Sequence, residues 1–225
     1  MKKIITLIFL AAIIIMPAFA MGSASEKTEE AKPDTVTTAS EYKEPETKKE
    51  ESKIDLSGKK ILMIVASKDF NDKEYFVPRN IFEEHGAKVI VASSKEDVVS
   101  ANGTKIKADI LLKNVKVRDY NAVVFIGGPG AKEYFNNEKA HYIATWSFGL
   151  RKPVAAICLA PVILAHSGIL SGRKATVIAS ETDTITNEGA IYTGSDVEVF
   201  GNTITANSSD AAEKFAKAIV NALSK

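Results

Sequence analysis

The chain has 225 residues, a formal net charge of +1, and 25% charged and 45% hydrophobic residues, with a single cysteine. The near-neutral charge gives no indication of a polyanionic partner such as nucleic acid. One cysteine excludes an intramolecular disulfide and a zinc site built from several cysteines. The three histidines, His85, His141 and His166, are not spaced as metal ligands.

The first twenty residues have the pattern of a secretory signal peptide. Lys2 and Lys3 precede an apolar stretch over residues 4–16, and residues 17–20 resemble an Ala-x-Ala cleavage site. The stretch is shorter than the roughly 20 apolar residues that span a bilayer. An uncleaved membrane anchor is the alternative. We expect cleavage near Ala20 and a protein located outside the cytoplasm, whether periplasmic, at the cell surface or secreted.

Residues 21–57 differ in composition from the rest of the chain. Glu, Lys, Thr, Ser and Pro dominate, and Tyr42 is the only aromatic residue. Such a segment buries too little apolar surface to offset the entropy lost on ordering, so we expect a disordered linker. Residues 58–225 then form one domain of ordinary size.

The domain begins with a strand, a helix and a second strand. The continuous apolar run over residues 60–66 is typical of a parallel strand that is covered on both faces. After a polar loop at 67–71, the spacing of apolar residues predicts a helix over 72–85, which ends at Gly86. Residues 88–92 predict the next strand.

A glycine cluster follows the third predicted strand. Residues 106–117 predict a short hairpin or an edge strand, and residues 122–126 predict a buried strand. This strand ends at Gly127-Gly128-Pro129-Gly130, where a ligand can approach the backbone without a Cβ in the way. No Lys-Ser or Lys-Thr pair follows the glycines, so we do not expect nucleotide binding. We predict neither a cofactor nor a metal.

The second half of the domain continues the alternation of helices and strands. A predicted helix over 137–150 carries Trp146, which we expect in the core. A strand then leads into Cys158, and a helix follows to Gly168. Further along we predict a strand, a hairpin and an amphipathic helix at residues 174–178, 197–206 and 211–223. This order predicts a flavodoxin-like α/β fold, a three-layer sandwich with a mostly parallel sheet and helices on both faces.

Cys158 lies where a buried strand gives way to a helix. A nucleophile at such a turn, called a nucleophile elbow, is held exposed with backbone N–H groups directed at its target. We expect the following helix to lower the pKa of the thiol. The alternative is a small buried hydrophobic residue, which is the usual role of a free cysteine.

Ligands of an open α/β sheet bind beyond the carboxyl ends of the strands, and three loops of this chain meet there. We predict Cys158 as the nucleophile. The backbone N–H groups of Leu159, Gly127 and Gly128 would form an oxyanion hole. Glu74 would have a raised pKa beside the thiol and would carry its proton. An ordinary glutamate of a first helical turn is the alternative role of Glu74.

Five motifs, in this order, resemble the ThiJ/PfpI superfamily, which has the class I glutamine-amidotransferase-like fold and includes deglycases and PfpI-type proteases. The motifs are residues 69–74 followed by Pro78, then residues 125–130, 156–161, 167–176 and 196–206. The resemblance covers residues 59–223. It implies a nucleophile at Cys158, a thiolate-facing glutamate at Glu74 and an oxyanion glycine at Gly128. It also implies a homo-oligomer, with a dimer as the expected form.

The chain departs from the superfamily at the histidine. PfpI-type proteases have a histidine directly after the cysteine, where this chain has Leu159. The deglycase branch has a histidine near the end of the following strand, and residues 177–180 contain none. We expect His141 and His166 on helices, directed away from the sulfur. Proteolysis is therefore not expected.

The resemblance implies glyoxalase-type or deglycase-type chemistry on small oxoaldehydes or their adducts. We expect a small carbonyl compound as the substrate, no nucleic acid, and a membrane contact only through an uncleaved signal segment. The first alternative is a non-catalytic redox sensor or chaperone-like stress protein that uses oxidation of Cys158. The second is a tethered binding module with an inactive site.

Overall fold

The computed structural model describes residues 54–225. The predicted signal peptide and nearly all of the predicted linker lie outside the described residues. Within residues 54–225, no helix combines the length and the hydropathy that a membrane span requires.

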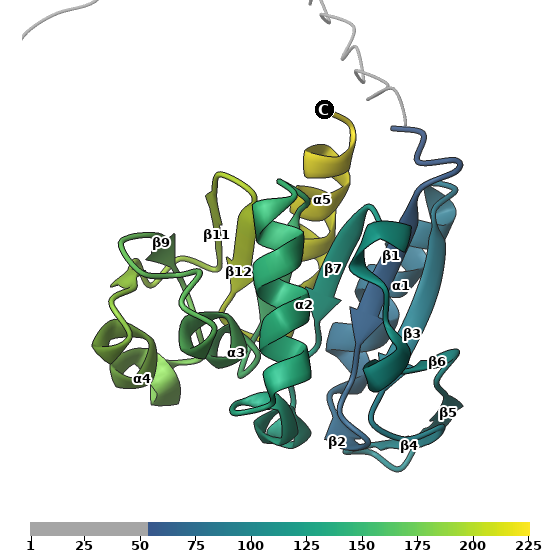
Figure 1. Cartoon of the computed structure of the whole chain (residues 1–225), viewed down its shortest axis with the longest axis horizontal. Helices are drawn as coiled ribbons and strands as arrows, with labels where there is room; N and C mark the ends of the chain where they lie inside the picture. The colour runs from purple at the N-terminus through teal and green to yellow at the C-terminus, as the bar shows by residue number, and fades with distance from the viewer. Residues whose placement is uncertain (1–53) are drawn as a thin grey trace, which may run out of the picture. The chain divides into compact units, whose positions relative to one another are not determined.

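A seven-stranded sheet forms the middle layer of the domain (Figure 1). Across the sheet the strands are β6 (Ile110–Leu111), β3 (Lys88–Ser93), β1 (Lys60–Ile64), β7 (Ala122–Phe125), β8 (Val154–Ile157), β12 (Thr203–Ala206) and β11 (Val197–Phe200). Only β11 pairs antiparallel with its neighbour. The five central strands have the order 2-1-3-4-5 of flavodoxin-like sheets. The predicted α/β fold with a mostly parallel sheet is confirmed.

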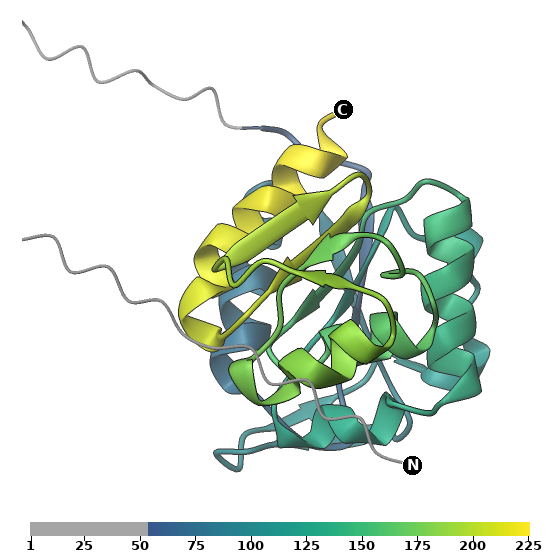
Figure 2. The same ribbon diagram turned by 90° about the vertical axis from the view of Figure 1, so that its left-hand side faces the viewer.

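Helices cover both faces of this sheet (Figure 2). One face carries α1 (Asp72–Glu84) and α5 (Ala212–Leu223), and the other carries α2 (Glu138–Gly149) and α3 (Pro161–His166). Along β1, Ile61 and Met63 belong to the core on the α1 side, while Leu62 and Ile64 belong to the core on the α2 side. The run is continuously apolar because side chains of a strand alternate between faces and both faces are buried here.

Smaller elements complete the domain outside the seven-stranded sheet and the four main helices. They are β2 (Lys68–Phe70), β4 (Asp97–Ser100), β5 (Lys105–Lys107), β9 (Lys174–Ala175), β10 (Ile191–Tyr192), α4 (Thr182–Asn187) and the short 3-10 helices η1 (Leu112–Asn114), η2 (Val117–Asp119), η3 (Pro129–Tyr134), η4 (Ala179–Glu181) and η5 (Ser209–Ala211). A three-stranded sheet contains β2, β4 and β5, and a two-stranded sheet contains β9 and β10.

Two predicted segments differ from the structure. The strand predicted at 174–178 is limited to β9, which pairs with β10 outside the main sheet. It ends early because the Thr176 N–H donates to the side chain of Thr205 in β12 rather than to the backbone of a neighbouring strand. The segment at 106–117 contains the edge strand β6, whereas the hairpin of β4 and β5 lies earlier, over residues 97–107, and only the end of β5 falls in the segment. The prediction that Trp146 lies in the core is wrong, because 45% of it is exposed.

Gly130 lies where two loops at the carboxyl edge of the sheet approach closely. A Cβ at this position would lie 1.8 Å from the backbone oxygen of Lys68. We expect Gly130→Ala to lower the free energy of unfolding by about 3 kcal/mol, because the backbone must shift to relieve the overlap. Gly149→Ala is the matched control, since a Cβ at Gly149 meets nothing within 4 Å. It should raise the same quantity by about 0.5–1 kcal/mol through helix propensity.

Urea unfolding of the two glycine variants beside the wild type measures both effects. A Gly130→Ala protein with the midpoint of the wild type would contradict the close packing of these loops.

Candidate active site

Cys158 directly follows β8 at the carboxyl edge of the main sheet. Its φ angle is +62°, a left-handed conformation that residues other than glycine seldom adopt. The Cys158 N–H donates to the Ala206 carbonyl over 2.8 Å, and the Cys158 carbonyl accepts from the Ile178 N–H over 3.1 Å. Neighbouring segments therefore hold the strained turn from both sides, and this geometry is that of a nucleophile elbow.

Glu74 lies in the first turn of α1 and is fully buried. Asn71 caps this helix, because its side-chain oxygen accepts from the Glu74 N–H over 3.2 Å. The Glu74 carboxyl interacts with the Cys158 thiol and with the Gly127 N–H. Neither carboxyl oxygen makes a hydrogen bond of good geometry. The structure thus brings Glu74 and Cys158 together. The carboxyl oxygens of Glu74 are buried and remain able to accept hydrogen bonds.

Two glycines make this close approach possible. A Cβ at Gly127 would lie 2.5 Å from Glu74 Oε2 and 2.9 Å from Cys158 Cβ, so a larger residue would push the pair apart. Gly128 has a φ of +94°, and a Cβ there would lie 2.5 Å from the Asn71 nitrogen. Both positions therefore require glycine. At Gly127 there is no space for a side chain, and Gly128 has in addition a backbone conformation that favours glycine.

The three predicted oxyanion donors are divided between two groups. The N–H groups of Gly128 and Leu159 interact with the Cys158 thiol, whereas the N–H of Gly127 interacts with the Glu74 carboxyl. All five predicted site residues lie together at the carboxyl edge of the sheet. The catalytic and oxyanion roles of these residues stay predictions.

Burial changes the protonation of both side chains. It raises the pKa of Glu74 from 4.5 to about 7, against the opposing effects of Cys158 and the Gly127 N–H. Burial, and then the charge of Glu74, raise the pKa of the Cys158 thiol to about 12, although the N–H groups of Gly128 and Leu159 oppose this. The expectation of a lowered thiol pKa is therefore wrong. The following helix, α3, has only six residues, and it begins at Pro161 rather than at the cysteine.

Because the two groups interact, they titrate as a pair. The pair loses its first proton near pH 7, from the carboxyl, and its second near pH 12, from the sulfur. Between these values the thiol keeps its proton beside an ionised Glu74, which can take that proton up without releasing it to solvent. This gives the site a built-in proton carrier next to a nucleophile.

The raised pKa of Glu74 also predicts a pH dependence of stability. Below pH 4.5 the carboxyl is protonated in the folded and the unfolded chain, and it has no effect. Between pH 4.5 and about 7 the folded state binds more protons than the unfolded state, so stability falls as the pH rises. The full loss amounts to about 3 kcal/mol.

The measurement is the free energy of unfolding of the wild type minus that of Glu74→Gln, between pH 4 and pH 8. We expect this difference to become more negative with rising pH. A difference that stays constant over the range would show that the folded and unfolded chains have the same Glu74 pKa.

The histidines do not complete the site. His141 Nε2 and His166 Nδ1 both lie within hydrogen-bond distance of the Phe135 carbonyl, at 2.8 and 2.9 Å. His85 Nδ1 lies 2.7 Å from the Ile81 carbonyl. In residues 54–225, no cluster of three His, Cys, Asp or Glu side chains is placed to hold a metal.

Two residues beside the pair were not predicted. Asn71 positions Glu74, and its place three residues before a glutamate is a recognisable capping signal. Ile178 contacts the elbow through its backbone, in the stretch where the deglycase branch has a histidine. No sequence signal assigns a role to an isoleucine at such a position.

The fold and the site define a class of α/β proteins in which a cysteine at a strand-to-helix turn faces a buried glutamate. The chain belongs to the DJ-1/PfpI family, whose sequence pattern matches residues 59–222. The predicted ThiJ/PfpI membership is therefore confirmed.

Relatives of known sequence and structure agree with this assignment. An uncharacterized protein of Methanocaldococcus jannaschii is 40% identical over 80% of this chain and 89% of its own length. A deglycase of Pyrococcus abyssi is 33% identical over 64% of this chain and 87% of its own length. A solved ThiJ/PfpI domain protein from Brachyspira murdochii has a TM-score of 0.72 and 30% identity, over 74% of this chain and 98% of its own. Drosophila melanogaster DJ-1beta has a TM-score of 0.68 and 27% identity, over 74% of this chain and 90% of its own.

Proposed function

We propose that the protein is a cysteine-dependent enzyme of the glyoxalase or deglycase type that acts on small α-oxoaldehydes or their adducts. The observation that carries this proposal is the buried Glu74 carboxyl against the Cys158 thiol, which places an ionised carboxyl beside a protonated thiol above pH 7. Relatives that are named deglycases support it at 33% identity.

The proposed reaction needs a nucleophile and one proton carrier. The sulfur of Cys158 attacks the aldehyde carbon, and the carbonyl oxygen takes up the proton to give a hemithioacetal. Glu74 then removes the hydrogen on that carbon as a proton and returns it to the neighbouring carbonyl carbon. The hydroxyl proton of the hemithioacetal moves to the neighbouring carbonyl oxygen, which leaves the thioester of a 2-hydroxy acid. Water cleaves the thioester, releases a 2-hydroxy acid and restores the thiol. One water is added overall, and no oxidant or reductant is required.

The remaining groups at the site fit this scheme. The N–H groups of Gly128 and Leu159 lie at the sulfur, where they can stabilise negative charge on the oxygen of the adduct. Within residues 54–225, Glu74 is the only titratable side chain that interacts with the thiol. A reaction in which one carboxyl performs each proton transfer therefore suits this chain better than peptide hydrolysis, which needs a general acid for an amine leaving group.

The test is incubation of the purified protein with methylglyoxal, the smallest oxoaldehyde that carries a methyl group. Proton NMR follows the loss of the aldehyde and the appearance of lactate. We expect lactate in a one-to-one ratio to the aldehyde consumed. Aldehyde loss without the 2-hydroxy acid, or no turnover beyond that of buffer, would reject the proposal.

Oxidation of the same thiol is the second candidate function, as in a redox sensor or stress protein. It is favoured by the placement of a raised-pKa carboxyl beside the sulfur, because a protonated carboxyl can donate a hydrogen bond to a sulfinate. Mild peroxide should then add two oxygen atoms to the Cys158 peptide selectively, as seen by mass spectrometry. An unchanged peptide mass would remove this candidate. An extracytoplasmic location and a homodimer remain part of the proposal.

A further inference from the structure

A row of exposed apolar side chains lies on the outer side of α2. Tyr142, Trp146 and Leu150 are exposed by 45%, 45% and 38%, and their spacing of four residues places them on one face. We call these three residues the α2 ridge. Small or apolar residues, Ala140, Ile143, Ala144 and Ser147, are buried on the opposite side of the helix. The ridge therefore takes no part in the core of the domain.

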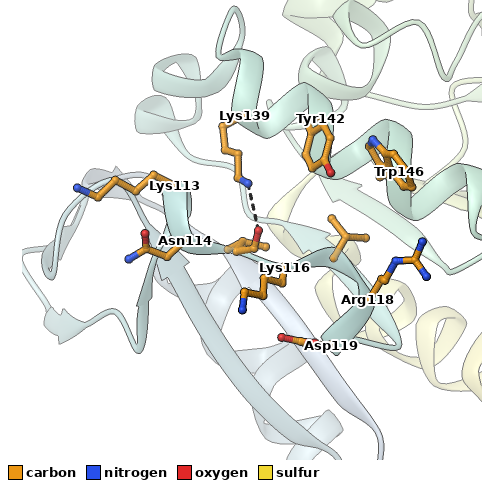
Figure 3. Close-up of a pocket in the computed structure, with 10 residues that line it drawn as sticks. Lys113, Asn114, Lys116, Arg118, Asp119, Lys139, Tyr142 and Trp146 are labelled. Atoms are coloured by element: carbon orange, nitrogen blue, oxygen red, sulfur yellow. Dashed lines mark hydrogen bonds between the residues drawn. The ribbon is translucent and has the colours of Figure 1, made fainter.

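A groove of about 790 Å³ runs between Tyr142 and Trp146 of the ridge and the segment that contains η1 and η2. Figure 3 shows Tyr142 and Trp146 on one wall, with Lys116 and Arg118 on the other. The complete lining consists of Lys113, Asn114, Val115, Lys116, Val117, Arg118, Asp119, Lys139, Tyr142 and Trp146. Four cations thus meet a single carboxylate, in a chain whose overall net charge is only +1. We call this feature the basic groove.

Two lysines fix the backbone of the groove. Lys139 Nζ donates to the Val115 carbonyl over 3.1 Å, and Lys152 Nζ donates to the Val117 carbonyl over 2.9 Å. Val115 and Val117 are themselves buried. Within residues 54–225, Lys113, Lys116 and Arg118 make no salt bridge. The backbone of the groove is therefore held in place, and these three cationic side chains can pair with the carboxylates of a partner.

The basic groove is separate from the candidate active site. The segment with η1 and η2 leads into the amino end of β7, whereas Cys158 follows the carboxyl end of β8. No lining residue of the groove belongs to the predicted site. A ligand in the groove would leave access to the thiol unchanged.

We propose that the basic groove binds an acidic peptide segment of a partner protein. Apolar side chains of the peptide would cover the α2 ridge, and its carboxylates would pair with Lys116 and Arg118. Aromatic and arginine side chains are the groups that dominate binding energy at such interfaces. The three ridge residues span about 12 Å along the helix, which suits successive apolar anchors of one peptide.

The charge of the groove argues against a second copy of this chain as its occupant. A two-fold contact places the same surface on both partners, so two sets of unpaired cations would face one another. The composition of the ridge argues against nucleic acid as the occupant of the groove. Tyr142 and Trp146 are followed along it by the aliphatic Leu150, which offers no ring for a base to stack on.

The test uses the full chain and a displayed library of random 12-residue peptides that lack tryptophan. Trp146 is the only tryptophan of the chain, so its emission reports directly on the groove. We expect selected peptides to combine apolar residues with at least two Asp or Glu residues. The synthesised consensus peptide should shift the Trp146 emission to shorter wavelength. The paired substitutions Lys116→Glu and Arg118→Glu should weaken its binding at least tenfold.

Controls separate this site from general surface charge. Lys88→Glu changes an exposed lysine on β3, and it should change the affinity less than twofold. The proposal would be overturned if the library yielded no binder, if the selected peptides lacked acidic residues, or if the groove substitutions left binding intact. It would also be overturned if oligo(dT) or anionic phospholipid vesicles shifted the Trp146 emission and the peptide did not.

Discussion

Cys158→Ser is expected to lower kcat/KM for methylglyoxal by at least about 100-fold. The serine hydroxyl is a far weaker nucleophile than the thiol, and within residues 54–225 Glu74 is the one titratable group available to activate it. The substitution removes no buried volume of note, and its backbone hydrogen bonds to Ala206 and Ile178 can persist. The fold should therefore survive while the chemistry is lost.

The rate of lactate production, measured by NMR for the wild type and Cys158→Ser at equal concentration, gives the ratio of their kcat/KM values. The midpoint of urea unfolding is the control, and it should lie close to that of the wild type. A serine variant that is folded and fully active would show that the reaction occurs elsewhere in the molecule.

Glu74→Gln is expected to change activity and stability in opposite directions. The amide can still occupy the space beside Gly127 and Cys158, but it cannot carry a proton. Loss of a general acid and base typically lowers rates by about 10²–10⁴-fold. At pH 8 the same change should raise the free energy of unfolding by up to about 3 kcal/mol, because a buried charge is removed.

Glu84→Gln is the matched control, since Glu84 lies on the same helix and is exposed. It should leave kcat/KM and the unfolding midpoint unchanged. Full activity in Glu74→Gln would reject the role of Glu74 as the proton carrier. A loss of both activity and stability would show that the carboxyl acts as a structural group.

Much of the fold could be predicted from local patterns. Continuous apolar runs such as residues 60–64 identified the central strands, because a parallel strand that is buried on both faces requires apolar residues at each position. The elbow was also visible, since Cys158 ends such a run. The approach of Glu74 to Cys158 followed from the rule that the carboxyl ends of parallel strands share one edge.

Other features depended on packing that the sequence does not display. Trp146 was expected in the core on account of its size, yet Ala140 and Ala144 occupy the inner face of α2 because the helix lies close to the sheet. The short strands β2, β4 and β5 exist only through pairing with one another, in a sheet where β2 and β5 flank β4. The raised pKa of the thiol follows from burial, and no property of neighbouring residues in the chain indicates how deeply a side chain is buried.

The most direct test of the coupling between Glu74 and Cys158 is the rate of Cys158 alkylation by iodoacetamide as a function of pH. In the wild type, we expect the rate to rise only well above pH 8.5, because burial and the charge of Glu74 raise the pKa of the thiol to about 12. In Glu74→Gln the charge is absent, so the rise in rate should move to lower pH. A single inflection near pH 8.5, the ordinary value of a free thiol, in both proteins would contradict the coupling of Glu74 and Cys158 on which the proposed chemistry depends.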